Sequence, residues 1–161
     1  KAVKSPIKQP KPNMKEWVGF SSLIRHSWWQ YLDFEYFGVK TNTISRVGQR
    51  YTSSDVFGMC GKYVCRAEFN TLKYDNMQGF LVGFNLSKQN PTQIEAHIYS
   101  YVPKIKSSGN AHFISIEKED ITDTGLIYSY TIDETKYDKY AKDLANTVNE
   151  LAKKVAKLKT T

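Results

Sequence analysis

The sequence predicts an α+β domain: an N-terminal helix, an antiparallel meander sheet of five to seven strands, and a long C-terminal helix packed on the sheet. Three observations support this class. Apolar residues recur at helical spacing near both ends, apolar and polar residues alternate in several segments between them, and the links between those segments are short and rich in turn residues. Such links are too short for crossover helices, so neighbouring strands should be antiparallel.

The first 13 residues differ in composition from the rest of the chain. They hold Pro6, Pro10 and Pro12 among lysines. A segment of this kind buries little apolar surface, so residues 1–13 are predicted to be a flexible basic arm. The whole chain has 161 residues, a size that suits one domain with its own core. Residues 14–161 are therefore predicted to form a single α+β domain.

The first helix is predicted from Met14 to Trp28. Asn13 is a suitable N-cap, and Glu16 three residues later completes a capping-box pattern. The apolar residues that follow at helical spacing are Trp17, Phe20, Ile24, Trp28 and Tyr31. Trp28 and Trp29 are adjacent and cannot face the same way, so one of them should lie in the core.

Strands are predicted where the period changes to two. The alternating segments are 32–36, 63–69, 80–86, 94–102 and 126–132, with a shorter strand at 113–116 and weaker candidates at 44–47 and 56–57. Asn, Asp, Gly, Ser and Pro cluster in the links, which is typical of hairpin turns.

A long helix is predicted over residues 133–159. Its apolar residues are spaced by alternating steps of four and three: Tyr137, Ala141, Leu144, Val148, Leu151, Val155 and Leu158. Such a helix is about 40 Å long, whereas a typical strand spans about 17–20 Å. The sheet should therefore cover only its first half. We call the remaining apolar positions, Val148, Leu151, Val155 and Leu158, the outer seam.

The outer seam is the predicted partner-binding surface. Three occupants are open: the first helix of the same chain, a second copy of the protein, or a different protein. Alternation of Val and Leu is typical of parallel coiled-coil dimers. A cover of some kind is expected, because an apolar seam left in water is unfavourable.

The net charge of +7 is concentrated at the two ends. Residues 1–15 carry five lysines and no acid, and residues 134–161 carry seven lysines against four acids. The middle has eleven basic and twelve acidic residues. Lys153, Lys154, Lys157 and Lys159 are therefore the predicted contacts for phosphate or another anion, and nucleic acid is one partner class to consider.

Two tyrosines on one predicted strand are candidates for an aromatic binding patch. Tyr99 and Tyr101 share a face with His97, and we expect that face to be exposed. Exposed aromatic rings can stack on bases or seat a protein partner. Tyr128 and Tyr130 alternate in phase with apolar neighbours, so we expect them to point inward.

The signals for catalysis are weak. Asp120 followed by Glu134 and Lys136 loosely resembles the acid-plus-ExK arrangement of metal-dependent nucleases, in which carboxylates hold Mg²⁺ and a lysine steadies the attacking water. The favoured interpretation is structural: Asp133 caps the long helix and Glu134 lies at its positive end. His97 is more simply a surface histidine than a catalytic one. No metal site and no cofactor is predicted.

Cys60 and Cys65 have two interpretations. A disulfide between them requires a turn, which Gly61 could supply, because five residues of straight strand span about 16 Å. The favoured alternative is two free, buried thiols.

The sequence thus favours a non-enzymatic binding or assembly module that acts through its long C-terminal helix and an aromatic sheet face. The alternative is a nucleic-acid-binding protein that uses its Lys-rich ends and exposed tyrosines, and a metal-dependent nuclease is the weakest hypothesis. The chain contains no apolar run long enough to span a membrane. Localisation is undetermined, although a targeting segment removed before Lys1 would place the protein outside the cytoplasm.

Overall fold

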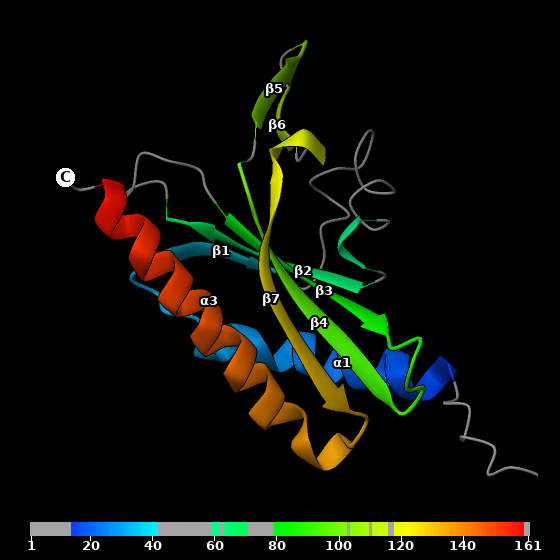
Figure 1. Ribbon diagram of the computed structural model, residues 1–161. Coiled ribbons are helices and arrows are strands. Elements are labelled where there is room, and N and C mark those ends of the chain that lie inside the picture. The colour runs from blue at the N-terminus through cyan, green and yellow to red at the C-terminus, as the bar shows by residue number, and fades with distance from the viewer. Residues whose placement is uncertain are drawn as a thin grey trace, which may run out of the picture.

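The computed structural model describes residues 14–41, 59–61, 63–70, 79–102, 104–109, 111–115 and 118–159. Helix α1 (Met14–Trp28) comes first, a sheet follows, and helix α3 (Tyr137–Lys159) comes last, which confirms the predicted α+β class (Figure 1). The 3-10 turns η1 (Trp29–Tyr31), η2 (Lys118–Asp120) and η3 (Glu134–Lys136) join these elements.

The main sheet is an antiparallel meander, as predicted. Its strands are β1 (Phe37–Thr41), β2 (Tyr63–Phe69), β3 (Gly79–Leu86), β4 (Gln93–Tyr101) and β7 (Ile121–Thr131), hydrogen-bonded in that order. A separate hairpin of β5 (Lys104–Ser108) and β6 (Ala111–Ser115) is inserted between β4 and β7. Because that hairpin forms its own sheet, β7 returns to pair with β4, and β1 and β7 are the two edges.

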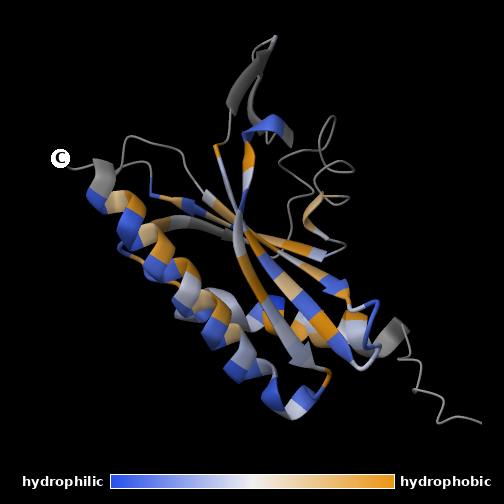
Figure 2. Ribbon diagram, in the orientation of Figure 1, coloured by the Kyte–Doolittle hydropathy of each residue, from blue (hydrophilic) through white to orange (hydrophobic). Residues whose placement is uncertain are grey.

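Both helices cover the same face of the main sheet (Figure 1). The core between them is built from inward residues of α1 and α3 and from one side of each strand of the main sheet, including Phe20, Ile24, Phe80, Ile98 and Leu144. Figure 2 shows hydrophobic residues recurring along α3 and alternating with hydrophilic ones along β4. These are the periods of 3.6 and 2 from which the elements were predicted.

One local prediction needs correction, and three others lie outside the described residues. Helix α1 has the predicted bounds, but residues 32–36 form a turn, and the strand starts only at Phe37. The cause is Asp33, whose carboxylate accepts a hydrogen bond from the Glu35 amide at 2.8 Å while its carbonyl accepts from Tyr36 and Phe37. The arm 1–13 and the weak strand candidates 44–47 and 56–57 lie outside the described residues.

The second face of the sheet has its own small core. Met59 and Cys60 lie over it and contact Val64, Leu81 and Tyr99. Close approach of this segment depends on Gly83, since a Cβ there would lie 1.5 Å from the Cys60 carbonyl oxygen.

The cysteines confirm the free-thiol interpretation. Cys60 belongs to the core of the second face and Cys65 to the core under the helices, so the sheet separates them. Both are free and buried, and burial raises the pKa of the Cys60 thiol to about 12.

A polar junction joins α1 to α3 along three turns of helix. Asp138 accepts hydrogen bonds from the Ser27 hydroxyl and the Tyr31 hydroxyl, each at 2.7 Å. Eleven residues further along α3, Asn149 accepts from the Asp33 amide and donates to the Tyr31 carbonyl, both at 2.8 Å. The segment that follows α1 is therefore held against the outer half of α3.

Candidate interaction surface

The outer seam of α3 is largely covered by the chain itself. Val148 is fully buried, with 0% of its surface exposed, and Leu151 and Val155 are half-buried against the core under the helices. Of the three predicted occupants, the same chain covers this part of α3, because the turn that follows the first helix is hydrogen-bonded to Asn149. Val148 is therefore covered within the chain, as one of the three predicted arrangements requires, and the outer seam as a surface for a partner stays a prediction. The side chain of Leu158 lies outside the described residues.

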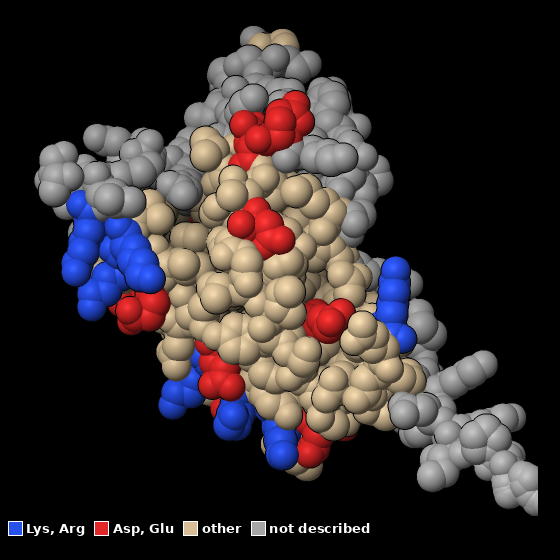
Figure 3. Space-filling model, in the orientation of Figure 1, with Lys and Arg blue, Asp and Glu red and all other residues tan. Residues whose placement is uncertain are grey.

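The predicted anion contacts are exposed where they are described. Lys153, Lys154 and Lys157 lie on the outward face of the last turns of α3, and the side chain of Lys159 lies outside the described residues. In Figure 3, Lys and Arg side chains gather along the border formed by α3.

The prediction of an exposed aromatic patch is wrong, because Tyr99 and Tyr101 are buried, with exposed fractions of 6% and 1%. Tyr101 lies in register with Gly79, which pairs in turn with Glu68 on the next strand. Since Gly79 has no side chain, the Tyr101 ring crosses above it and the hydroxyl donates to Glu68 Oε1 at 2.6 Å. Arg66 Nη1 lies 3.6 Å from the same oxygen.

Burial also raises the pKa of the Tyr101 phenol well above its usual range, and the neighbouring Glu68 carboxylate acts in the same direction. The phenol therefore stays protonated and serves as a hydrogen-bond donor to that buried carboxylate. Tyr128 and Tyr130 do point inward, as predicted, and Tyr130 stacks on Tyr140 with ring centroids 4.0 Å apart.

His97 belongs to a polar cluster on the second face of the sheet. Its Nε2 lies 2.7 Å from Asp123 Oδ1, and its Nδ1 lies 2.8 Å from the Tyr99 hydroxyl. Tyr99 also donates to the Met59 carbonyl at 3.1 Å, so this cluster ties residue 59 to the sheet. The nearby Cys60 thiol has a raised pKa and lacks the thiolate character that a nucleophile requires.

The nuclease arrangement does not assemble. Asp120 precedes the first residue of β7 and Glu134 follows its last, so the two carboxylates lie at opposite ends of a strand roughly 35 Å long. Asp133 instead accepts a hydrogen bond from the Thr135 amide at 3.0 Å and caps η3 at the start of α3. Among the residues that the structure describes, no group of three or more His, Cys, Asp or Glu side chains could hold a metal ion.

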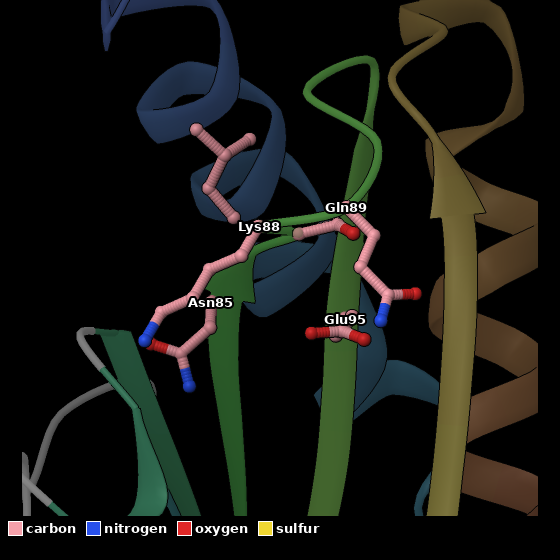
Figure 4. Close-up of a pocket in the computed structure, with 6 residues that line it drawn as sticks. Asn85, Lys88, Gln89 and Glu95 are labelled. Carbon is pink, nitrogen blue, oxygen red and sulfur yellow. The ribbon is translucent and has the colours of Figure 1, made fainter.

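A surface pocket of about 490 Å³ lies at the β3–β4 hairpin (Figure 4). It is lined by Asn85, Leu86, Ser87, Lys88, Gln89 and Glu95. The one carboxylate and one amine of this lining are on a hairpin that is open to solvent. The pocket therefore lacks the enclosed apolar walls that are typical of small-molecule sites.

The edge strand β7 has an unusual composition for an edge. From residue 124 to residue 131 its sequence is TGLIYSYT, with no charged residue and no proline. Ile127 is 60% exposed, and Ser129 and Thr131 on the same face are exposed as well. Edges of this length are usually protected by lysine, proline or a covering segment.

The hydrogen bonds of β4 and β7 show which backbone groups point outward. The Ile132 amide donates to the Thr92 carbonyl, and β7 pairs with β4 residue by residue from Leu126 to Thr131. Because backbone groups alternate along an antiparallel strand, those of Leu126, Tyr128 and Tyr130 face β4. The amides and carbonyls of Ile127, Ser129 and Thr131 therefore face away from the sheet. In the described part of the chain, no strand pairs with them.

Figure 3 places this edge on a charge-poor surface. Uncharged residues cover the lower part of β7 in this view, whereas acidic side chains lie over its upper part and the lysines of α3 follow the border. The edge combines unpaired backbone groups, exposed β-branched side chains and a lack of charge. We call residues 127–131 the open edge.

The sequence matched no family model, no curated protein and no solved structure. None of the described helices is long and apolar enough to cross a membrane.

Sequence reasoning missed the open edge, although one signal was present. The strand around residues 126–132 was predicted with its correct inward face, and its lack of charge could be read directly. Its position at the edge could not, because the sequence also predicts a strand at 113–116 that could have been its neighbour.

Proposed function

We propose that the protein is a non-enzymatic binding and assembly module that receives an additional β-strand along β7. The observation that carries the proposal is the open edge, where three alternate residues, Ile127, Ser129 and Thr131, present outward backbone groups with which no described strand pairs. Strand addition uses such groups for affinity and alternate side chains for selectivity.

The open edge supports the proposal better than the outer seam of α3 does. Val148 is buried and Leu151 and Val155 are half-buried in the protein's own core, so little apolar surface of the seam remains for a partner. By contrast, Ile127 projects from the edge strand into solvent. An added strand would place its own side chains beside Ile127 and pair the outward backbone groups in one step.

Amide hydrogen exchange on the full chain tests the proposal. In dilute protein the amides of Ile127, Ser129 and Thr131 should exchange rapidly, whereas those of Leu126, Tyr128 and Tyr130 should be protected by β4. Extended peptides selected from a random library should slow exchange at the first three positions. If the Ser129 amide stays protected from exchange at every dilution without any peptide, the proposal is contradicted, because the edge would then be covered by the chain itself.

A matched pair of variants gives a second readout. Ser129→Pro removes an outward amide without removing a bond to β4, so the fold should tolerate it and peptide binding should be lost. Tyr128→Pro removes an inward amide and should unfold the strand. Equal peptide binding by wild type and Ser129→Pro would rule out strand addition at this edge.

Nucleic-acid binding is the second candidate. It is supported by the exposed Lys153, Lys154 and Lys157, together with the exposed Trp29 in the turn that follows α1. Burial of Tyr99 and Tyr101 removes the aromatic platform on the sheet that this function would otherwise use.

A further inference from the structure

We infer that the strand received by β7 is β7 of a second copy of this chain, paired antiparallel about a two-fold axis at Ser129. This inference rests on the proposed function, since it uses the same open edge, and it adds the identity of the partner. The pairing would join the main sheets of two copies into one continuous sheet.

The outward backbone groups define the register. In an antiparallel pair, residues that exchange two hydrogen bonds must both face the partner strand. Centring the axis on Ser129 places Ser129 opposite its own copy and Ile127 opposite Thr131 of the partner subunit. Every outward residue of the open edge then finds an outward residue, and each of the three pairs exchanges two backbone hydrogen bonds.

The side chains that this register brings together from the two copies are also compatible with each other. Ile127 and Thr131 are both β-branched, a type of cross-strand pair that stabilises sheets. On the opposite face, the register sets Tyr128 opposite Tyr130 of the partner subunit, and each of these rings is already packed in the core of its own copy. No charged residue lies between residues 124 and 131, so the two copies bring no like charges together. A two-fold interface requires this self-complementarity.

The bulge in β7 limits the pairing to this segment. The register between β4 and β7 shifts between Ile98 and Tyr99, and Gly125 has a φ of +79°. The strand therefore bends away before residue 126, which leaves only the regular stretch from Leu126 to Thr131 for a partner. Asp123, which contacts His97, stays outside the paired segment.

Light scattering after size exclusion, over a dilution series of the full chain, measures the association. Wild type should be a dimer that dissociates on dilution. Ser129→Pro should raise the dissociation constant by about tenfold to a hundredfold, because two symmetric hydrogen bonds are lost. Ser129→Thr keeps the amide and should remain dimeric. Ile127→Lys should weaken the dimer, while Thr122→Lys, on the same strand beyond the open edge, should not.

A disulfide trap tests the register without depending on the proline variant. Ser129→Cys should form a cross-linked dimer on mild oxidation, because two-fold partners in this pair lie about 5.5 Å apart at Cα. Thr122→Cys should not, since its two copies would lie roughly 45 Å apart along the strands. Cys60 and Cys65 are buried and do not compete.

Two results would overturn the inference: wild type that is monomeric at every concentration, or equal cross-linking of the Ser129→Cys and Thr122→Cys variants. The proposed function is tested separately by the selected peptides. Peptide binding that is lost in Ser129→Pro, together with a monomeric wild type, would keep strand addition and remove the second copy as its natural occupant.

Discussion

Gly79 makes room for the hydrogen bond that the buried carboxylate of Glu68 accepts. Glu68 is 2% exposed, and a buried carboxylate without a donor is costly. Its donor, Tyr101, lies two strands away, and the ring reaches it only because Gly79 leaves the intervening position empty. Because Gly79 has no side chain, the hydrogen bond from Tyr101 to Glu68 connects β4 to β2 across β3.

Gly79→Ala should therefore destabilise the fold. The new Cβ would lie 2.6 Å from the Tyr101 ring, so the ring must move and Glu68 loses its donor. We expect a loss of about 2–4 kcal/mol in the free energy of unfolding, measured by urea denaturation. Gly19→Ala is the control: a Cβ there meets nothing within 4 Å, and the change should add about 0.5–1 kcal/mol in the middle of α1. Equal effects of the two substitutions would contradict the crossing of Tyr101 over Gly79.

At the scale of elements, one carboxylate, that of Asp138, should make the polar junction between the α1 segment and α3 sensitive to pH. Hydrogen bonds from the Tyr31 hydroxyl and then the Ser27 hydroxyl lower the pKa of Asp138 below its usual 3.8. A group with a lowered pKa in the folded state stabilises the fold above its unfolded pKa. This contribution should be complete above about pH 4 and decline as the pH falls through the lower, folded value.

Asp138→Asn should remove this part of the acid sensitivity. The urea midpoint of wild type should fall between pH 5 and pH 3 by more than that of the variant, because the amide cannot gain a proton in this range. Ser27→Ala combined with Tyr31→Phe removes both donors and should flatten the profile in the same way. Identical pH profiles of wild type and Asp138→Asn would show that the junction does not hold the carboxylate in its charged form.

The lysines at the end of α3 allow a test of the alternative function. If they contact phosphate, a triple change of Lys153, Lys154 and Lys157 to Glu should weaken binding to single-stranded oligonucleotides and reduce its dependence on salt. Fluorescence anisotropy at two salt concentrations measures both effects. Lys142→Glu, exposed on the first half of the same helix, is the control. No binding by wild type at low salt would end this hypothesis.

At the scale of the whole molecule, the last described turns of α3 contribute to the core under the helices. Ala152 is fully buried and Leu151 and Val155 are packed against the residues under the helices. The polar junction holds the segment after α1 against this half of α3, at Asn149.

A chain that ends at Asn149 should consequently lose stability without losing self-association while it is still folded. We expect a decrease of about 3 kcal/mol in the free energy of unfolding, from the apolar area of Leu151 and Val155. Thermal unfolding gives the first quantity and light scattering below the melting temperature gives the second. Unchanged stability together with loss of the dimer would instead identify the outer seam as the interface.

The sequence by itself determined the α+β class, the bounds of α1, the long last helix and the inward face of most strands. Those features follow from local periodicity, which a single strand or helix expresses without its neighbours. The exposed polar residues of the last turns of α3 were also predictable, since helical spacing separates the two sides.

Only the tertiary structure decided which surfaces are available to a partner. Alternation of apolar and polar residues distinguishes the two faces of β4. It does not show that Met59 and Cys60 cover the second face. Tyr99 and Tyr101 were therefore expected to be exposed to solvent, but they are buried. Edge position depends on strand order, and the hairpin β5–β6 leaves β7 beside β4 with an outer side that no strand of the described residues pairs. Both properties arise from contacts between segments distant in sequence, which periodicity cannot encode.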